Sequence, residues 1–215
     1  MERHEAAQAL IRAGQWIMDK HMTWGSAGNM SLRLDEDHLL ITASGTRFDS
    51  LTPDAFTLYR LSDGHCEGGK PSKELPVHTA VYRAVPWCGA VVHASPFYTT
   101  LAASSDLELP NDLFVENMYY LQRLCRIPYA HPGSEALAQA VADAAPQGNM
   151  ILMQNHGVLV YDGALSEALI GLEVLENTCR MALAAQQAGI SLRHLPPETV
   201  HDFLYNSGYK KPRTW

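Results

Sequence analysis

Two short apolar runs separated by a polar tetrad constrain the fold of this chain more than any other stretch. Residues 150–153 (Met-Ile-Leu-Met) and 158–161 (Val-Leu-Val-Tyr) flank residues 154–157 (Gln-Asn-His-Gly). Apolar runs of this length, rich in β-branched and aromatic residues, are typical of buried strands. The tetrad therefore places the imidazole of His156 beside a glycine in an apolar setting, where the ring nitrogens need partners. His156 is either a satisfied core histidine or a ligand.

A second histidine near the end of an apolar run favours the ligand interpretation. Residues 89–95 (Gly-Ala-Val-Val-His-Ala-Ser) predict another buried strand, with His93 near its end. Two strand-end histidines suggest a shared site. His78, in contrast, follows the helical period of residues 75–84 on their apolar side, and we interpret it as a structural histidine.

The composition favours one globular domain that covers residues 1–215, with a basic tail from about residue 206. Of the 215 residues, 47% are hydrophobic and 18% are charged, which is enough for a sizeable core. The net charge of −7 argues against a nucleic-acid partner, and no apolar run approaches the ~20 residues of a membrane helix. The first residues do not resemble a signal peptide, and the four scattered cysteines form no CxxC pair. We therefore expect a cytoplasmic protein with reduced thiols.

Periodicity predicts a mixture of helices and strands. Because several strands follow one another through short turns, we expect a mostly antiparallel sheet. Residues 62–69 look like a polar connection, and residues 106–126 carry no clear pattern. Helices are expected at 5–21, 72–84, 97–103, 135–145 and 198–205, and a long helix capped by Ser166; further strands are expected at 32–34, 38–43, 56–61 and 127–129.

Loops of small polar residues precede several of these elements. In residues 23–31 and 44–46, glycines let backbone N–H groups approach an anion, while serine and asparagine side chains add donors. An ordinary turn between a helix and a strand is the alternative for the first loop. Glu74 lies at the start of the helix predicted over 72–84, where free N–H groups favour an anion. In the simplest interpretation, Glu74 only complements the helix dipole.

Taken together, five motifs resemble the class II aldolase/adducin family in order and spacing. The similarity runs from about residue 5 to about residue 185. The family includes fuculose-phosphate aldolase, ribulose-phosphate 4-epimerase, methylthioribulose-phosphate dehydratase and a sugar-acid phosphate decarboxylase branch. The resemblance implies a three-layer α/β/α sandwich around a mostly antiparallel sheet, and a cyclic homotetramer with active sites between subunits. The five motifs are Gly28-Asn29-Met30-Ser31, Ser44-Gly45, Ser72-Lys73-Glu74, His93 and Asn155-His156-Gly157.

The resemblance also implies roles for single residues. Glu74 matches the catalytic carboxylate. Lys73 stands where the family usually has a second serine, and it adds positive charge near the expected phosphate or carboxylate. The sequence Lys-Pro-Ser-Lys-Glu at 70–74 looks most like the decarboxylase branch. The loops that hold the substrate phosphate in the family match Ser26, Gly28, Asn29, Ser44, Gly45 and Ser72.

The metal of the family, usually zinc, is held by three histidines. His93 and His156 match the first and the third. The second is expected two residues after His93, because residues i and i+2 share one face of a strand, but Ser95 stands there. Three outcomes stay open. Glu74 completes a two-histidine, one-carboxylate site for zinc, manganese or cobalt; His131 or a neighbouring subunit supplies the third ligand; or the site is empty and the chain is silent.

The implied function is that of a metal-dependent aldolase-type lyase. It would cleave a carbon–carbon bond in a small phosphorylated sugar or sugar acid through a metal-stabilised enediolate. A decarboxylase, an epimerase and a non-catalytic adducin-like protein are the alternatives. The proton-donating tyrosine of the aldolases aligns with Phe114 in this chain, and Tyr119 or Tyr120 could replace it.

Overall fold

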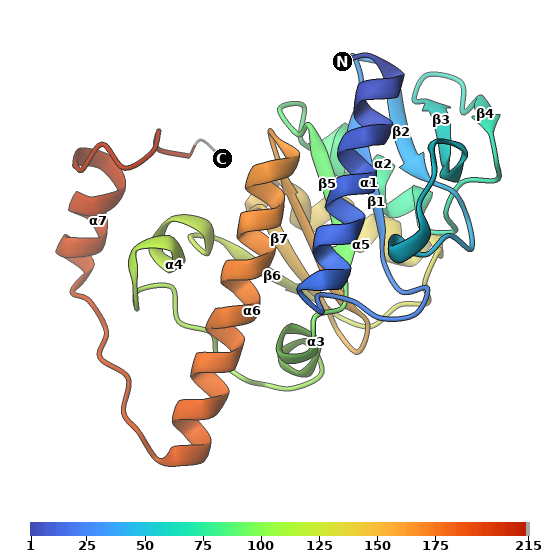
Figure 1. Ribbon diagram of the computed structural model, residues 1–215. Helices are drawn as coiled ribbons and strands as arrows, with labels where there is room; N and C mark the ends of the chain where they lie inside the picture. Colours follow the sequence, from blue (N-terminus) through green and yellow to red (C-terminus); the bar gives the residue numbers. More distant parts are fainter. Residues whose placement is uncertain (214–215) are drawn as a thin grey trace.

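A mixed sheet forms the centre of the computed structural model, which describes residues 1–213 (Figure 1). Within these residues the sheet has eight strands in the order β4-β3-β2-β1-β5-β8-β7-β6. Every neighbouring pair is antiparallel except β6 and β7, which are parallel. The mostly antiparallel sheet predicted from the sequence is therefore confirmed. Its strands are β1 (Asn29–Arg33), β2 (His38–Thr42), β3 (Phe56–Arg60), β4 (Cys66–Gly68), β5 (Ala90–Ala94), β6 (Leu124–Ile127), β7 (Met150–Met153) and β8 (Gly157–Asp162).

Helices cover both faces of this sheet. One face is packed by α1, α3, α4 and α6, and the other by α2 and α5. Figure 1 shows α1 and α6 crossing the sheet side by side, with α7 standing apart beside α4. The helices are α1 (Arg3–Asp19), α2 (Leu75–Ala84), α3 (Phe97–Ala103), α4 (Val115–Tyr120), α5 (Glu135–Ala144), α6 (Leu165–Ala188) and α7 (Pro197–Asn206), with 3-10 turns at Phe48–Ser50, Pro53–Ala55 and Ala145–Gln147.

Strand β8 shows why the two apolar runs are buried. Side chains alternate across a strand. Val158 and Val160 pack in the cluster with α1 and α6, whereas Leu159 and Tyr161 pack in the cluster with α2 and α5. Every residue of β7 and β8 is buried. The continuous apolar pattern therefore reflects strands covered on both sides.

Several boundaries differ from the sequence prediction. β1 begins at Asn29 rather than at 32, because the polar side chains of Asn29 and Ser31 are buried through hydrogen bonds instead of lying in a loop. The predicted connection 62–69 contains β4, whose three residues are all exposed and so carry no apolar signal. The strand predicted at 127–129 lies earlier in the chain, as β6 at Leu124–Ile127. Ser166 does not cap α6, since Ala164 occupies that position.

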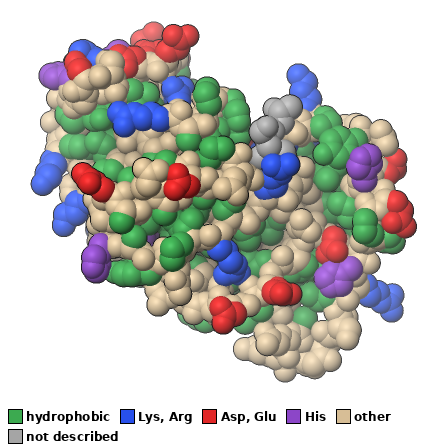
Figure 2. Space-filling view, turned by 180° about the vertical axis from the view of Figure 1, so that it is seen from behind, with side chains coloured by type: hydrophobic (Ala, Val, Ile, Leu, Met, Phe, Trp, Pro, Cys, Tyr) green, Lys and Arg blue, Asp and Glu red, His purple; other side chains and the backbone are tan. Residues whose placement is uncertain are grey.

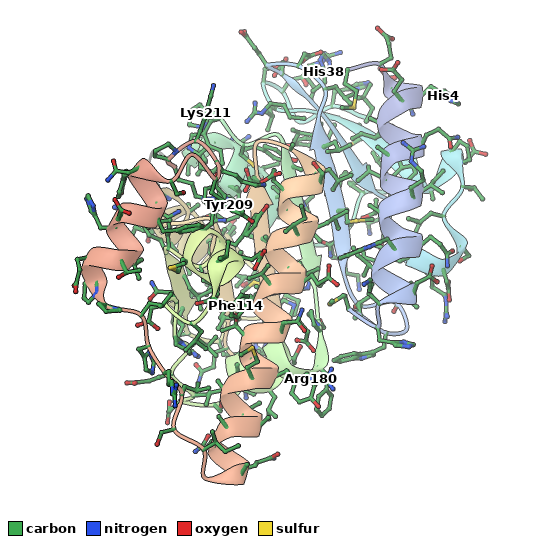
Figure 3. The ribbon with its side chains drawn as sticks, turned by 60° about the vertical axis from the view of Figure 1, so that its left-hand side comes forward. His4, His38, Phe114, Arg180, Tyr209 and Lys211 are labelled. Carbon is green, nitrogen blue, oxygen red and sulfur yellow. The ribbon has the colours of Figure 1, made fainter. Side chains whose placement is uncertain are left out.

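The described part of the basic tail folds back on the molecule. Tyr209, which is labelled in Figure 3, is part of this tail. Its ring packs on that of Tyr119 in α4, with centroids 5.9 Å apart. Lys210 pairs with Glu167 at 2.6 Å. Arg213, farther along the tail, pairs with Asp162 at 2.8 Å. The tail prediction also included residues 214 and 215, which lie outside the described residues.

Charged side chains of both signs lie on the side of the molecule shown in Figure 2. On the side shown in Figure 2, basic side chains are scattered among acidic and apolar ones. None of the helices within residues 1–213 combines the length and the apolar character needed to cross a membrane.

Candidate metal centre

The β7–β8 turn brings the second histidine to the first. Gly157 has φ 153°, and a Cβ atom there would lie 2.7 Å from the carbonyl oxygen of Ala94 and 2.9 Å from Oγ of Ser95. Only glycine permits so close an approach between the turn and the end of β5. The rings of His93 and His156 consequently lie edge to face, with centroids 4.9 Å apart.

Glu74 joins these two imidazoles from the first turn of α2. It occupies the N-cap position, and its backbone N–H donates to Oγ of Ser72 at 3.2 Å. Its Oε2 lies 3.3 Å from Nε2 of His93, and its Oε1 lies 3.1 Å from Nε2 of His156. One ligand atom from each of Glu74, His93 and His156 fits within 4.8 Å of the others, which is close enough for a single ion. The three metal ligands predicted from the sequence are therefore brought together.

The hydrogen bond behind His93 leaves Nε2 of its neutral ring free to bind an ion. Nδ1 of His93 lies 3.0 Å from the carbonyl oxygen of Val158, an arrangement that requires Nδ1 to carry the proton. In a neutral ring, Nε2 then turns a lone pair toward the carboxylate of Glu74. Two acceptors face each other in a buried place, and a divalent ion between them would satisfy both.

Charges within the centre favour an ionised carboxylate. Burial alone would raise the pKa of Glu74, but His93, His156 and a hydrogen bond from Asn29 together hold that pKa well below its usual range. Burial lowers the pKa of His93 and so disfavours a second proton on its ring. Metal binding needs a carboxylate and neutral imidazoles, and the environments of Glu74 and His93 favour these forms.

A cavity of about 460 Å³ opens in front of the three ligands. The loops predicted to bind phosphate contribute to its lining, and their residues Gly28 and Gly45 have φ values of 95° and 82°. Lys73 is exposed at the rim. The cavity is lined by all ten site residues expected from the sequence, which are Ser26, Gly28, Asn29, Ser44, Gly45, Ser72, Lys73, Glu74, His93 and His156.

Asn29 makes side-chain contacts that the sequence did not suggest. Its Nδ2 donates to Oε2 of Glu74 at 2.7 Å, and its Oδ1 accepts from Nε2 of His78 at 2.5 Å. The side chain of this residue thus supports the carboxylate. The motif that contains Asn29 located the residue, but no pattern in the sequence pairs it with His78.

Other candidates from the sequence lie elsewhere. His131 is exposed, with Nδ1 3.0 Å from the hydroxyl of Tyr129, and it does not join the cluster of ligands. The hydroxyl of Tyr119 donates to the backbone of the tail, and that of Tyr120 donates to Glu167. Neither tyrosine lines the cavity, nor does Phe114.

Cavity residues that the motifs did not indicate are small or apolar. Thr46 follows Ser44-Gly45 directly in the same loop, and this position in the sequence could have indicated that it lines the cavity. Trp24 and Pro132 are exposed residues at the rim, and no sequence pattern indicated that they belong to the site. Ser95 also lines the cavity, on the same side of the chain as His93.

Comparison with known proteins gives consistent matches. Residues 8–183 match the family model described as the class II aldolase and adducin N-terminal domain. A 3-oxo-tetronate 4-phosphate decarboxylase from Haemophilus influenzae is 32% identical over 205 residues, which cover 94% of this chain and 96% of that protein. A methylthioribulose-1-phosphate dehydratase from Yersinia enterocolitica is 35% identical over 184 residues, covering 78% and 86%.

Solved structures agree with this fold. YgbL from Klebsiella pneumoniae superimposes with a TM-score of 0.83 at 31% identity, covering 94% of this chain and 99% of that one. An L-fuculose 1-phosphate aldolase superimposes with a TM-score of 0.78 at 24% identity, covering 93% and 94%.

Proposed function

Because the chain belongs to the class II aldolase and adducin family, we propose that it is a metal-dependent lyase. Its reaction is the decarboxylation of a phosphorylated 3-oxo sugar acid. Curated relatives from several bacteria carry the name 3-oxo-tetronate 4-phosphate decarboxylase. The Lys73 side chain at the cavity rim fits an acidic substrate better than the serine usual at this position.

One observation supports this proposal above the others. Oε2 of Glu74 and Nε2 of His93 are both acceptors, are both buried and lie 3.3 Å apart. Without a cation such an arrangement is unfavourable. Glu74, His93 and His156 are the residues that would hold the ion, with zinc as the first candidate and manganese or cobalt as alternatives for a mixed nitrogen and oxygen set.

The bound metal would act as a Lewis acid that stabilises negative charge on the oxygen atoms of the substrate. In the proposed reaction the bond between the carboxylate carbon and its neighbour breaks, and carbon dioxide leaves. The electron pair remains on the substrate as an enediolate. Glu74 lies beside the ligand histidines and delivers a solvent-derived proton to the carbon atom that lost the carboxylate.

The polar loops would hold the other end of the substrate. In this proposal Ser26, Ser44 and Ser72 donate hydroxyl hydrogen bonds to the phosphate, and the backbone N–H groups near Gly28 and Gly45 complete the anion site. Lys73 binds the carboxylate or the phosphate. Asn29 contributes backbone to this wall, because its side chain is bound to Glu74 and His78.

The proposal also covers the assembly and location of the protein. We expect a single α/β/α sandwich domain that forms a cyclic homotetramer in the cytoplasm, with active sites between subunits. The mass of the particle in solution, measured by light scattering, tests the tetramer.

Metal content is the first test of the function. Elemental analysis should find about one divalent metal per chain in the wild type and a loss of it in His156→Ala. The metal-loaded wild type should then release carbon dioxide from 3-oxo-tetronate 4-phosphate. Release of an aldehyde from a 5-deoxyribulose 1-phosphate instead would favour aldol cleavage, the activity named for a relative at 31% identity.

A non-catalytic role is the second candidate, and Ser95 is the observation that favours it. Serine is a poor metal ligand, so the centre has one imidazole fewer than the family pattern. Failure to take up zinc, manganese or cobalt on soaking would contradict the lyase proposal and favour this alternative. A ligand that binds the native state must also raise its melting temperature, so unchanged melting with metal and sugar phosphate would lead to the same conclusion.

A further inference from the structure

A chain of buried hydrogen bonds ends on the carboxylate of Glu74. The hydroxyl of Tyr82 lies 3.0 Å from Oγ of Ser31, which lies 2.7 Å from Nδ1 of His78. Nε2 of His78 lies 2.5 Å from Oδ1 of Asn29. Nδ2 of Asn29 lies 2.7 Å from Oε2 of Glu74. These five side chains connect β1 and α2 to the metal centre, and we name the first four the relay.

The chemistry of the last group fixes the direction of every bond in the relay. An ionised carboxylate only accepts, so the amide of Asn29 must turn its N–H toward Glu74. Its oxygen then faces His78 and needs a donor, which makes Nε2 of His78 the protonated nitrogen. Nδ1 of the neutral ring accepts from Ser31, and Ser31 accepts from Tyr82.

Burial keeps this arrangement in one state. Ser31 and His78 are fully buried, and Tyr82 and Asn29 are 2% and 7% exposed. Burial lowers the pKa of His78 to about 3, so the ring remains neutral at working pH. An alternative orientation of the amide would face two acceptors or two donors toward each other without water to satisfy them.

The two oxygens of Glu74 are consequently unequal. Oε2 has the amide hydrogen of Asn29 and also faces His93. Oε1 lies 3.1 Å from Nε2 of His156 but accepts no well-aligned hydrogen bond. Oε1 is therefore the oxygen that no hydrogen-bond donor among the described residues holds, and it is the one available for a proton.

We propose that His78 is a positioning residue that locks the Asn29 amide onto Oε2 of Glu74 and so reserves Oε1 for proton transfer. This inference rests on the proposed function, in which Glu74 delivers a proton to the enediolate carbon. The proton leaves Oε1, its electron pair returns to the carboxylate, and the enediolate pair forms the new carbon–hydrogen bond. His78 itself does not touch the substrate, because Asn29 stands between it and Glu74.

Two substitutions at His78 separate positioning from packing. His78→Leu removes the donor and the acceptor, whereas a glutamine at this position can donate to Asn29 and accept from Ser31. In the metal-loaded full chain with 3-oxo-tetronate 4-phosphate, His78→Leu should lower kcat by about tenfold or more with KM changed by less than about threefold. His78→Gln should recover most of kcat, and both should retain about one metal per chain.

Tyr161→Phe is the matched control. The hydroxyl of Tyr161 donates to the carbonyl oxygen of Ala145 on the same face of the sheet, away from the cavity. The variant loses a buried hydrogen bond without affecting the relay, so its kcat should equal that of the wild type. If His78→Leu keeps the wild-type kcat, or if His78→Gln is as slow as His78→Leu, the positioning role is overturned.

NMR tests the relay without any turnover. Nitrogen-15 spectra should show His78 as the neutral tautomer with the proton on Nε2. The side-chain amide protons of Asn29 should exchange slowly in wild type, His78→Gln and Tyr161→Phe, and rapidly in His78→Leu. A proton on Nδ1, or equal exchange in all four proteins, would overturn the relay. If the wild type shows the expected relay in NMR but turns over no substrate, the proposed function is contradicted while the hydrogen-bond relay still holds.

Discussion

At the scale of single residues, Ser95 is the clearest departure from a three-histidine metal site. It lies two positions after His93, is 4% exposed and lines the cavity. Residues at this spacing share a face of the strand, so the position faces the ligands even though its side chain cannot replace an imidazole. The metal affinity of the centre should therefore be limited by this one position.

We expect Ser95→His to bind zinc roughly tenfold or more tightly than the wild type, because a third imidazole completes the nitrogen set. Competition with a chromogenic chelator measures the affinity. Ser104→His, an exposed serine after α3, is the control and should leave zinc binding unchanged. An unaltered affinity in Ser95→His would mean that the position does not face the metal.

Substitution of Glu74 should separate chemistry from folding. In Glu74→Gln the amide keeps the shape of the side chain but cannot carry a proton, and loss of a general acid or base costs about 10²–10⁴-fold in rate. Carbon dioxide release should fall by that amount while circular dichroism keeps its wild-type form. Glu135→Gln, at the exposed start of α5, serves as the control. Normal turnover by Glu74→Gln would exclude the role of this residue.

The motifs located the residues of the centre but not the contacts between them. All ten predicted site residues line one cavity, because antiparallel pairing brings the start of β1, the ends of β2 and β5 and the start of β8 to the same end of the sheet, beside the start of α2. The contacts of Asn29 with His78 and Glu74 were not predictable, since partners 49 and 45 residues apart leave no local pattern. His78 was predicted as a structural histidine on the apolar side of its helix, and it is fully buried there.

At the scale of elements, the short helix α3 depends on a side chain from α6. Oε1 of Glu176 accepts from the backbone N–H of Tyr98 at 3.0 Å, and Oε2 accepts from the N–H and the hydroxyl of Thr99 at 2.7 and 2.8 Å. Free N–H groups at a helix start need such partners. The sequence predicted α3, but not its cap, which lies 77 residues away.

Glu176→Ala should lower the free energy of unfolding by about 1–2 kcal/mol, because it removes the cap and leaves buried donors unpaired. Urea denaturation followed by circular dichroism measures the loss. Glu173→Ala on the same helix is the matched control. Glu173 pairs at 2.9 Å with Lys20, whose side chain is about half exposed, so its removal should cost less than about 1 kcal/mol. Equal losses in the two variants would argue against the capping role.

Elements with a long apolar pattern were predictable, whereas the short elements β4 and α4 were not. The apolar runs of β7 and β8 and the stripe of α6 identified these elements correctly. β4 has no buried residue, and α4 has only six residues, so neither produces enough periodicity to be recognised. The predicted N-cap of α6 was wrong. Ser166 is a residue type that often caps helices, but the helix already begins at Leu165 and Ala164 is its N-cap.

At the scale of the whole molecule, distant segments meet at the centre of the sheet. β1 pairs with β5, and β5 pairs with β8, so residues 29, 93 and 159 lie across three adjacent strands. The sequence indicated an antiparallel sheet but not this order, which depends on long-range pairing. The same pairing buries His78 and His93 between sheet and helix, where neither ring can readily take a second proton.

Buried neutral histidines should make the stability of the whole fold depend on pH. The ordinary pKa of His78 is 6.5, and burial lowers it to about 3. Below pH 6.5, His78 binds a proton in the unfolded chain but stays neutral in the folded chain. Its contribution to the free energy of unfolding is therefore complete above pH 6.5 and decreases as the pH falls toward 3. The loss is at most about 1.4 kcal/mol per pH unit for one such group.

His78→Gln should therefore show a shallower decrease in unfolding free energy between pH 6 and pH 4.5 than the wild type, because glutamine does not titrate. Urea denaturation of metal-free protein at several pH values measures both slopes. Burial also lowers the pKa of His93. Because His93 is present in both proteins, part of the dependence of unfolding free energy on pH should remain in His78→Gln. His4→Gln, at an exposed position in α1, should keep the full wild-type slope. Parallel curves for His78→Gln and the wild type would mean that His78 is protonated equally in the folded and unfolded chain.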